Sequence, residues 1–351
     1  MTQPERSRVD YFDTLRVLAT LAVIVLHLSA QHWADIDVSS RAWFAFNLYD
    51  SAVRWAVPVF VMISGALFLS GTQRLSDILK KNVLRLVTAF LFWSAAYALY
   101  AHSAYDLTWE DTFFRFLKGH YHMWFLFMIV GLYLLIPLLR RIAADRALME
   151  YFLTLSLLFT FLLPQIASLL TLTGGKFSAV FSAVLGKFFF YFTLGFTAYF
   201  IGGFYLSRAE LPRRAETGLM LLGVLGFALT LVLSWRASVM DGAATERFYG
   251  YNTVGVLLTS IAVFLFGRRH LGFPSLGGKG RAAIRALSRW SFGAYLIHPM
   301  VIETLNLQLG LNTLSCNAFF SVPLLALLVG TLSFLLSALL HQIPVVKKYI
   351  V

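Results

Sequence analysis

The sequence predicts an all-α, polytopic integral membrane protein with about ten transmembrane helices and both chain ends in the cytoplasm. Of its 351 residues, 59% are hydrophobic and only 13% are charged, whereas soluble domains average about 25% charged residues. Apolar runs of about 20 residues, long enough to cross a hydrocarbon core of roughly 30 Å, recur along the whole chain. This composition argues against a soluble enzyme.

The predicted spans are joined by polar connections. The first apolar run follows Arg6 and Arg8 and superficially resembles a signal peptide. Because it contains Arg16 and His27, and because many further spans follow, we expect a retained first helix. We expect the whole chain, residues 1–351, to form a single transmembrane domain. The predicted spans are residues 14–33, 52–71, 83–101, 122–139, 148–171, 186–206, 217–236, 252–267, 290–308 and 317–341.

The net charge of +12 could suggest a nucleic-acid partner, but the position of the charge argues against one. Basic residues gather in the connection after every second span, as cytoplasmic loops do, and an even number of spans places both termini on that side. The expected partners are therefore membrane lipids and no nucleic acid. The basic clusters are Arg74, Lys80, Lys81 and Arg85; Arg140, Arg141 and Arg146; Arg208, Arg213 and Arg214; and Arg268 and Arg269 through Arg289.

One stripe of the first span carries two ionisable residues. Arg16 and His27 are 11 positions apart, which is three helical turns and a rise of roughly 16 Å. The stripe places a cation near the cytoplasmic interface and an imidazole deep in the membrane, where ionisable groups are costly and usually functional. Snorkelling of Arg16, simple packing of His27 and a local ion pair of Arg16 with Asp13 are the alternatives. The joint spacing favours function.

Two further polar groups lie at the predicted outer side. Arg54 falls at the outer end of the second span, followed by Pro58, which frees a backbone carbonyl in mid-helix. Ser64 and Gly65 permit close helix approach. His122 lies at the outer mouth of the fourth span. Either Arg54 and His122 bind a polar ligand, or Arg54 snorkels and the aromatic block around His122 is an interfacial anchor.

A late span carries a fourth group. Tyr295 and His298 are three positions apart and share a helical face, and Pro299 is expected to distort the helix there. Glu303 follows at a depth where a carboxylate needs a partner. Cys316 is the single cysteine, which excludes an internal disulfide and a cysteine metal cluster. We predict no metal site.

The four groups together resemble the membrane acyltransferase-3 family. The spacing of Arg16 and His27 is similar to its Arg-x10-His signature, and Val57 to Gly65 (VPVFVMISG) is similar to its second-helix block. The stretch that begins at His122 (HMWFL) is similar to its His-Leu-Trp-Phe-Leu block, and Ser291 to His298 (SFGAYLIH) to its late-helix block. The blocks stand in the family's order and run over nearly the whole chain.

The sequence departs from the family at an arginine pair. Many members carry Arg-x-x-Arg in the loop after the second helix, whereas the matching stretch here, Lys80 to Arg85 (KKNVLR), keeps only the second arginine. Lys80 or Lys81 could bind a phosphate instead, but as a point charge without the bidentate fork of arginine.

The resemblance implies an acyl donor, most simply acetyl-CoA, that arrives from the cytoplasm of a bacterium and reaches a protein of the inner membrane. It implies an acceptor hydroxyl on a cell-surface or lipid-linked glycan at the other side. The residues expected to bind the donor are Arg16, Asp13, Lys81 and Arg85. The residues expected to bind the acceptor are Arg54, His122 and Glu303.

His27 is the expected catalytic group in this interpretation. It acts either as general base on the acceptor hydroxyl or as a nucleophile that carries the acyl group, and the sequence leaves both roles open. Tyr295 and His298 are expected to orient His27 or to polarise the thioester carbonyl.

Two other classes of protein remain as alternatives. A transporter of a sugar or acylated lipid, lined by Arg54, His122, His298 and Glu303, would move its substrate without consuming CoA, but it leaves the stripe of the first span unexplained. A membrane scaffold or sensor would use the same polar residues as hydrogen bonds between helices, and substitutions would then lower stability rather than abolish a reaction. The sequence predicts no oligomeric state.

Overall fold

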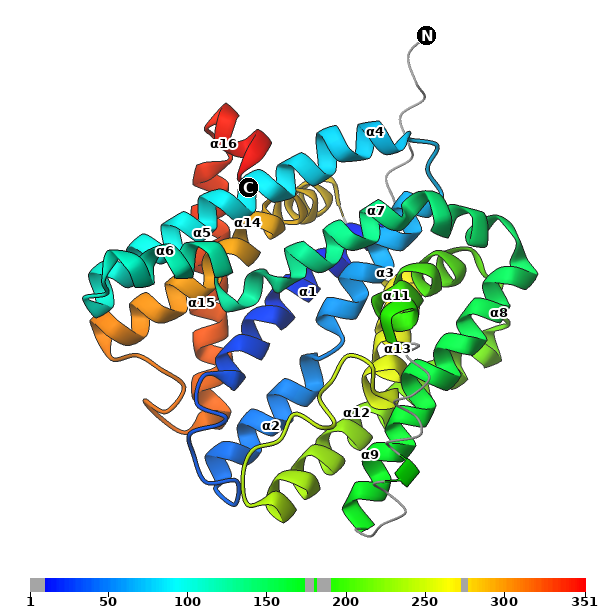
Figure 1. Cartoon of the computed structure of the whole chain (residues 1–351), viewed down its shortest axis with the longest axis horizontal. Helices are drawn as coiled ribbons and strands as arrows, with labels where there is room; N and C mark the ends of the chain where they lie inside the picture. The colour runs from blue at the N-terminus through cyan, green and yellow to red at the C-terminus, as the bar shows by residue number, and fades with distance from the viewer. Residues whose placement is uncertain (1–9, 174–179, 182–190, 273–276) are drawn as a thin grey trace.

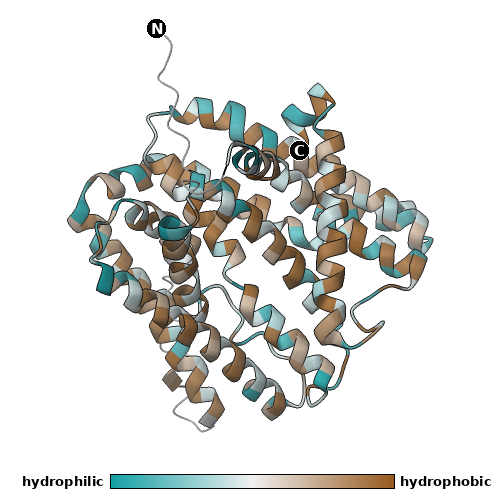
Figure 2. Ribbon diagram, turned by 180° about the vertical axis from the view of Figure 1, so that it is seen from behind, coloured by the Kyte–Doolittle hydropathy of each residue, from teal (hydrophilic) through white to brown (hydrophobic). Residues whose placement is uncertain are grey.

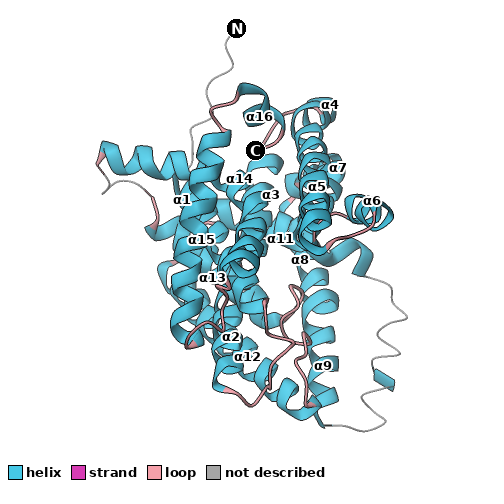
Figure 3. Cartoon of the chain, turned by 90° about the vertical axis from the view of Figure 1, so that its left-hand side faces the viewer, coloured by secondary structure: helices cyan, strands magenta, loops and turns pink. Residues whose placement is uncertain are grey.

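The computed structural model describes residues 10–173, 180–181, 191–272 and 277–351, and every regular element in these ranges is a helix (Figures 1 and 3). In chain order the elements are α1 (Asp10–Ala30), α2 (Arg41–Val53), α3 (Ala56–Leu69), α4 (Leu75–Ile78), η1 (Leu79–Val83), α5 (Leu84–Tyr105), α6 (Trp109–Lys118), η2 (Tyr121–Met123), α7 (Trp124–Ala144), α8 (Arg146–Ser156), η3 (Leu157–Leu162), α9 (Leu163–Thr173), α11 (Tyr191–Arg208), α12 (Arg213–Asp241), α13 (Val254–His270), α14 (Gly278–Leu309), α15 (Ala318–Leu340) and α16 (Pro344–Tyr349).

Helices lie where the sequence predicts membrane spans. In the described part of the chain, seven segments are long and apolar enough to cross a membrane: Asp10–Ala30, Arg41–Leu69, Leu75–Tyr105, Trp109–Ala144, Arg146–Leu172, Arg213–Asp241 and Ala318–Leu340. Helices α11, α13 and α14 occupy the other three predicted positions, and their crossing stays a prediction. Residues 186–190 of the sixth predicted span lie outside the described residues. Hydrophobic residues cover much of the long helices (Figure 2).

The second predicted span is wrong in its start. Helix α2 begins at Arg41, where the Ser40 hydroxyl accepts a hydrogen bond from the Trp43 amide at 3.1 Å. It ends at Val53, and α3 begins at Ala56 after a short turn that contains Arg54. Arg54 therefore lies inside a segment of 29 residues and not at its outer end. Pro58 lies in the first turn of α3 rather than in mid-helix, so its missing N–H costs that helix no hydrogen bond.

Helix α1 packs against α2, α3, α13, α14 and α15, which places it in the interior of the helical bundle (Figure 1). The short helices α4 and α16 lie at one end of the molecule, and α9 and α12 reach the other (Figures 1 and 3). We call the first the basic end, because α4, η1, α16 and the first turns of α14 carry many of the Lys and Arg residues. The charge pattern predicts that it faces the cytoplasm.

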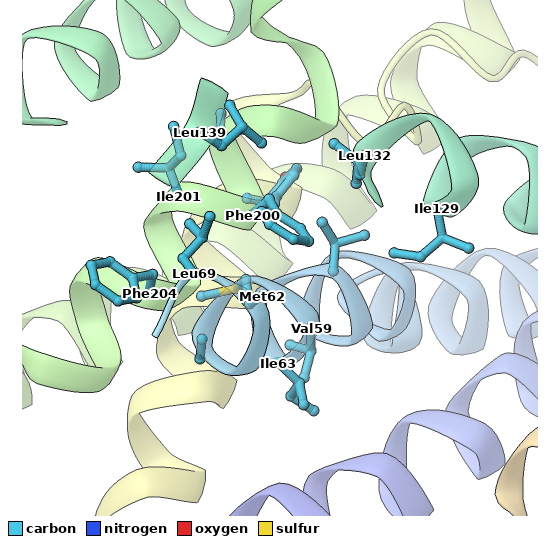
Figure 4. Packing of buried hydrophobic residues seen from close by; sticks show 14 of the residues in the cluster. Val59, Met62, Ile63, Leu69, Ile129, Leu132, Leu139, Phe200, Ile201 and Phe204 are labelled. Atoms are coloured by element: carbon cyan, nitrogen blue, oxygen red, sulfur yellow. The ribbon is translucent and has the colours of Figure 1, made fainter. Parts of the chain in front are cut away.

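One buried cluster joins α3, α7 and α11 (Figure 4). In Figure 4 it includes Val59, Met62 and Ile63 of α3, Ile129, Leu132 and Leu139 of α7, and Phe200, Ile201 and Phe204 of α11. In lipid, helices associate largely through close packing, and small residues at the contact let two backbones approach. Gly65 of α3 and Gly203 of α11 fill this role, because a Cβ at either would overlap the main chain of the other helix, at Phe200 and Met62 respectively.

Replacing Gly203 with alanine is expected to lower the free energy of unfolding by about 2–3 kcal/mol, because neither backbone can yield to the added methyl group. Gly202 is the matched control on the same helix, since the nearest atom to a Cβ there is Cδ2 of Leu153 at 4.0 Å. Alanine at 202 should be neutral or stabilise the helix by up to about 1 kcal/mol. Thermal unfolding in detergent compares the two, and equal melting temperatures would contradict the close contact.

Candidate functional site

The predicted stripe of α1 is present, with Arg16 in its second turn and His27 in its last. The Arg16 guanidinium lies 3.4 Å from the Asp13 carboxylate, which is almost fully buried. The Ser288 hydroxyl of α14 donates to the same carboxylate at 2.7 Å. Asp13 therefore joins α1 to α14 and holds Arg16 at the basic end.

His27 meets His298 of α14, with Nδ1 of His27 2.6 Å from Nε2 of His298. The two rings are within 8° of parallel and their centroids are 4.9 Å apart. The distance between the centroids equals the distance between the two nitrogen atoms plus the radius of each ring. The rings therefore lie edge to edge in one plane, and the hydrogen bond between them is close to linear. His298 is fully buried, which makes it a fixed support for His27.

Tyr295 has a different partner from the expected one. Its hydroxyl donates to the main-chain oxygen of His122 at 2.5 Å, and its carbonyl accepts from Nδ1 of His298 at 2.7 Å. The side chain thus fixes the start of α7 against α14, while the main chain orients His298. Tyr295 therefore contacts His298, which in turn contacts His27.

Glu303 is paired with His120, which the sequence analysis does not single out. Nε2 of His120 lies 2.8 Å from the Glu303 carboxylate, and Nδ1 of His120 lies 3.0 Å from Nδ1 of His122. His122 is buried, with its ring centroid 5.7 Å from that of His298. The Tyr97 ring stacks on His120 at 4.1 Å. Glu303 therefore has the partner that its depth requires.

A small cavity of about 210 Å³ opens beside this pair, and we call it the Glu303 cavity. Helices α5, α6 and α14 contribute its walls. Its lining combines aromatic rings, a guanidinium, an imidazole and a carboxylate, which is a polar surface able to bind hydroxyl groups. The lining residues are Tyr97, Ala98, Ala101, Tyr105, Arg115, Gly119, His120 and Glu303.

Two larger cavities lie toward the basic end. The first, the polar cavity, has a volume of about 440 Å³ and is lined by Arg16, Ser64, Leu67, Phe68, Gln73, Asn82, Arg85, Leu86, Tyr133 and Phe292. The second, the amphipathic cavity, has a volume of about 450 Å³ and is lined by Arg16, Val23, Val57, Phe60, Arg85, Phe125, Ser288, Arg289, Ser291, Phe292, Tyr295, His341 and Lys347. Arg16, Arg85 and Phe292 line both.

The amphipathic cavity changes character along its length. Cationic side chains of Arg85, Arg289 and Lys347 stand at the basic end, and the walls are apolar where Val23, Val57 and Phe125 line it. Val23 lies one helical turn before His27 on α1, and Arg16 lies seven residues before Val23, a rise of roughly 10 Å. The cavity therefore leads from a cluster of fixed cations toward the His27–His298 pair.

Arg54 is held by its own cluster. Its guanidinium lies 2.5 Å from the buried Asp50 carboxylate and 4.5 Å above the Tyr249 ring, whose hydroxyl donates to Asn47. Burial, with a smaller contribution from Asp50, raises the pKa of Tyr249 above its ordinary value, so the phenol stays neutral. Breaking such a buried pair leaves an uncompensated charge and is strongly destabilising. The contacts of Arg54 described here are those of a structural ion pair.

The structure does not bring Lys81 into either large cavity. Asn82 lines the polar cavity beside Arg85 instead, and Arg289 and Lys347 add the further cations of the amphipathic cavity. In the sequence, Arg289 is only part of the basic cluster that indicates the topology. A usable signal for His120 was present, since it stands two positions before His122 in the same block.

The fold and this site define an integral membrane protein in which a buried imidazole pair adjoins a cavity with a cationic end. The family model described as acyltransferase domain (Acyl_transf_3) matches residues 9–342 of the chain. The chain therefore belongs to this family, and it is a membrane acyltransferase. No curated protein and no solved structure is significantly similar to the chain.

Proposed function

We propose that the protein is an O-acyltransferase of the bacterial inner membrane that moves an acyl group, most simply acetyl, from cytoplasmic acyl-CoA to a hydroxyl of a cell-surface or lipid-linked glycan. The observation that carries the proposal is the amphipathic cavity. It has cations at the basic end, apolar walls along its length, and Val23 one turn from His27. Acyl-CoA presents its groups in the same order as these surfaces: phosphates first, then a long, weakly polar arm, and the thioester last.

Arg16 and Arg85 are the residues that would hold the phosphates of the donor. Both line the polar and the amphipathic cavity, and arginine offers a planar fork of donors that suits phosphate. Asp13 fixes Arg16 from behind through a contact of 3.4 Å. Arg289 and Lys347 supply further positive charge in the amphipathic cavity.

His27 would perform the transfer in one of two ways. As general base, it removes the proton of the acceptor hydroxyl while that oxygen attacks the thioester carbon. The C–S bond then breaks, and the proton passes to the departing thiolate. As nucleophile, His27 attacks the thioester, releases CoA and passes the acyl group to the hydroxyl in a second step. Both routes require a free lone pair on His27.

The Glu303 cavity is the proposed place for the acceptor sugar. Its aromatic and charged walls suit a sugar ring, and His120 and Glu303 lie between it and His122. Within the family, the stretch Ser51-Ala-Val-Arg54 before the Val-Pro block is also similar to the enterobacterial common antigen O-acetyltransferase. We take from this likeness an acetyl donor and a lipid-linked glycan acceptor.

The decisive experiment uses the purified protein in lipid vesicles with acetyl-CoA. We expect micromolar binding by calorimetry, and release of the free thiol of CoA when a lipid-linked glycan extract is added, with the acetyl label found in the glycan. If the folded protein moved glycan across the vesicle membrane without binding acetyl-CoA, this result would contradict the proposal and would support the transporter.

A further inference from the structure

The wall that α14 gives to the amphipathic cavity continues beyond that cavity. Ser288, Phe292 and Tyr295 line the cavity, and their spacing of four and three residues puts them on one face of the helix. The same spacing reaches Arg285 and Arg281 in the direction of the basic end. Arg281 lies 14 residues before Tyr295, a rise of roughly 21 Å. One face of α14 therefore runs from the apolar part of the cavity to two arginines.

These arginines line a further hollow, which we call the arginine hollow. It has a volume of about 480 Å³ and is lined by Gly278, Arg281, Ala282, Arg285 and Arg289. Arg289 lines the amphipathic cavity as well, so the two spaces adjoin at this side chain. Among the residues that the structure describes, no carboxylate lines either of them. The positive charge at the end of the amphipathic cavity therefore extends along α14.

The two arginines on this face have different surroundings. The Arg285 guanidinium lies 3.0 Å from the Asp10 carboxylate of α1, so its position is fixed and part of its charge is neutralised. Arg281 is exposed, and in the described part of the chain no carboxylate forms an ion pair with it. Its charge and its planar fork of N–H donors are therefore available to an anion.

The position and charge of the arginine hollow match one end of acyl-CoA. The ribose of CoA carries a 3′-phosphate in addition to the pyrophosphate, and this group lies farther from the thioester along the donor. Arg16 and Arg85 are the proposed partners of the phosphates at the mouth of the amphipathic cavity. The arginine hollow follows on the side away from the apolar walls, and a guanidinium suits a phosphate.

We propose that the arginine hollow binds the 3′-phosphate of the donor, with Arg281 as the residue that recognises it. The inference rests on the proposed function, because it concerns the same donor. It makes the protein selective for acyl-CoA over donors that lack the 3′-phosphate. The stretch from Lys80 to Arg85 keeps only one arginine of the family's pair, and α14 supplies cations that this stretch lacks.

The test compares the binding of acetyl-CoA and of its 3′-dephospho form to the purified full-length protein, by calorimetry in an uncharged detergent. We expect the wild type to bind acetyl-CoA about tenfold more tightly, in line with a hydrogen bond between charged groups. In Arg281→Gln, acetyl-CoA should bind about tenfold more weakly while the dephospho form binds as before. Added salt should reduce the preference of the wild type, because the recognised charge is exposed.

Lys279→Gln is the matched control. Lys279 carries the same charge and lies two residues before Arg281, which puts it roughly 200° away around α14, and it is not among the residues that line the arginine hollow. This variant should keep the preference for acetyl-CoA. Equal weakening of both compounds by Arg281→Gln, or loss of the preference in Lys279→Gln, would indicate general attraction to a basic surface and would overturn the proposal.

The wild-type protein alone separates this inference from the proposed function. Equal affinity for the two compounds would overturn the inference even if the Arg281→Gln variant failed to fold. The proposed function would then stand, because acetyl-CoA would still bind and react. If the folded protein bound neither compound, the proposed function would fail and the inference would fail with it.

Discussion

Replacing His27 with glutamine is expected to reduce acyl transfer by about 10²–10⁴-fold, the range that general-base assistance contributes. The glutamine amide can still donate to Nε2 of His298, which keeps the contact between α1 and α14. It has no nitrogen lone pair to accept a proton or an acyl group. Transfer should therefore be lost while the melting temperature and acetyl-CoA binding stay near those of the wild type.

His270 supplies the control for this substitution. It lies in the last turn of α13 and is exposed, so His270→Gln removes an imidazole without touching the site. Stopped-flow measurement of CoA release then compares the two variants. Full turnover in His27→Gln would rule out His27 as base and as nucleophile. A burst of CoA release from the wild type without acceptor would select the nucleophile.

Replacing Arg16 with glutamine is expected to weaken acetyl-CoA binding by about 10- to 100-fold. A hydrogen bond to a charged group contributes about 1.5–3 kcal/mol, and each 1.4 kcal/mol corresponds to a factor of ten. Asp13 keeps the Ser288 hydroxyl as a partner at 2.7 Å, so the fold should survive. Arg16→Lys should recover only part of the affinity, because an ammonium lacks the bidentate fork.

Arg146→Gln is the control for charge. Its side chain is 82% exposed, pairs with Glu150 and lies outside both donor cavities. Calorimetry of acetyl-CoA against the three variants and the wild type measures the difference. Equal weakening by Arg146→Gln and Arg16→Gln would show a general loss of positive charge and would remove Arg16 from the proposed donor site.

The stripe of α1 could be predicted because it depends only on helical periodicity, and the structure keeps Arg16 and His27 on the same helix. The partner of His27 could be named but not placed. Whether His298 reaches it depends on how α14 crosses α1 and on the orientation of the His298 ring, whose Nδ1 lies 2.7 Å from the Tyr295 carbonyl. Neither the crossing nor the ring orientation follows from the spacing of residues along one helix.

The start of the second span was predicted wrongly for a local reason. Asn47 and Asp50 lower the mean hydropathy before Arg54, so the hydropathy of the sequence predicts too late a start for the second span. The structure buries both residues.

The resemblance to the family implies that Lys81 helps Arg85 to bind phosphate, and this role stays a prediction, although Lys81 lines neither large cavity. Residues 79–83 form the π-helical turn η1, whose extra residue per turn shifts the helical phase and turns Asn82 toward the cavity instead.

The separation of the cavities has an electrical consequence. Tyr97 lines the Glu303 cavity and Tyr295 lines the amphipathic cavity, and the buried His122 lies between their rings at 5.4 and 5.3 Å. A continuous water path here would dissipate the transmembrane potential, which is worth about 2.3 kcal/mol per elementary charge for each 100 mV. The packed rings of Tyr97, His122 and Tyr295 lie between the two cavities, and a barrier of this kind is expected to oppose the flow of ions across the membrane.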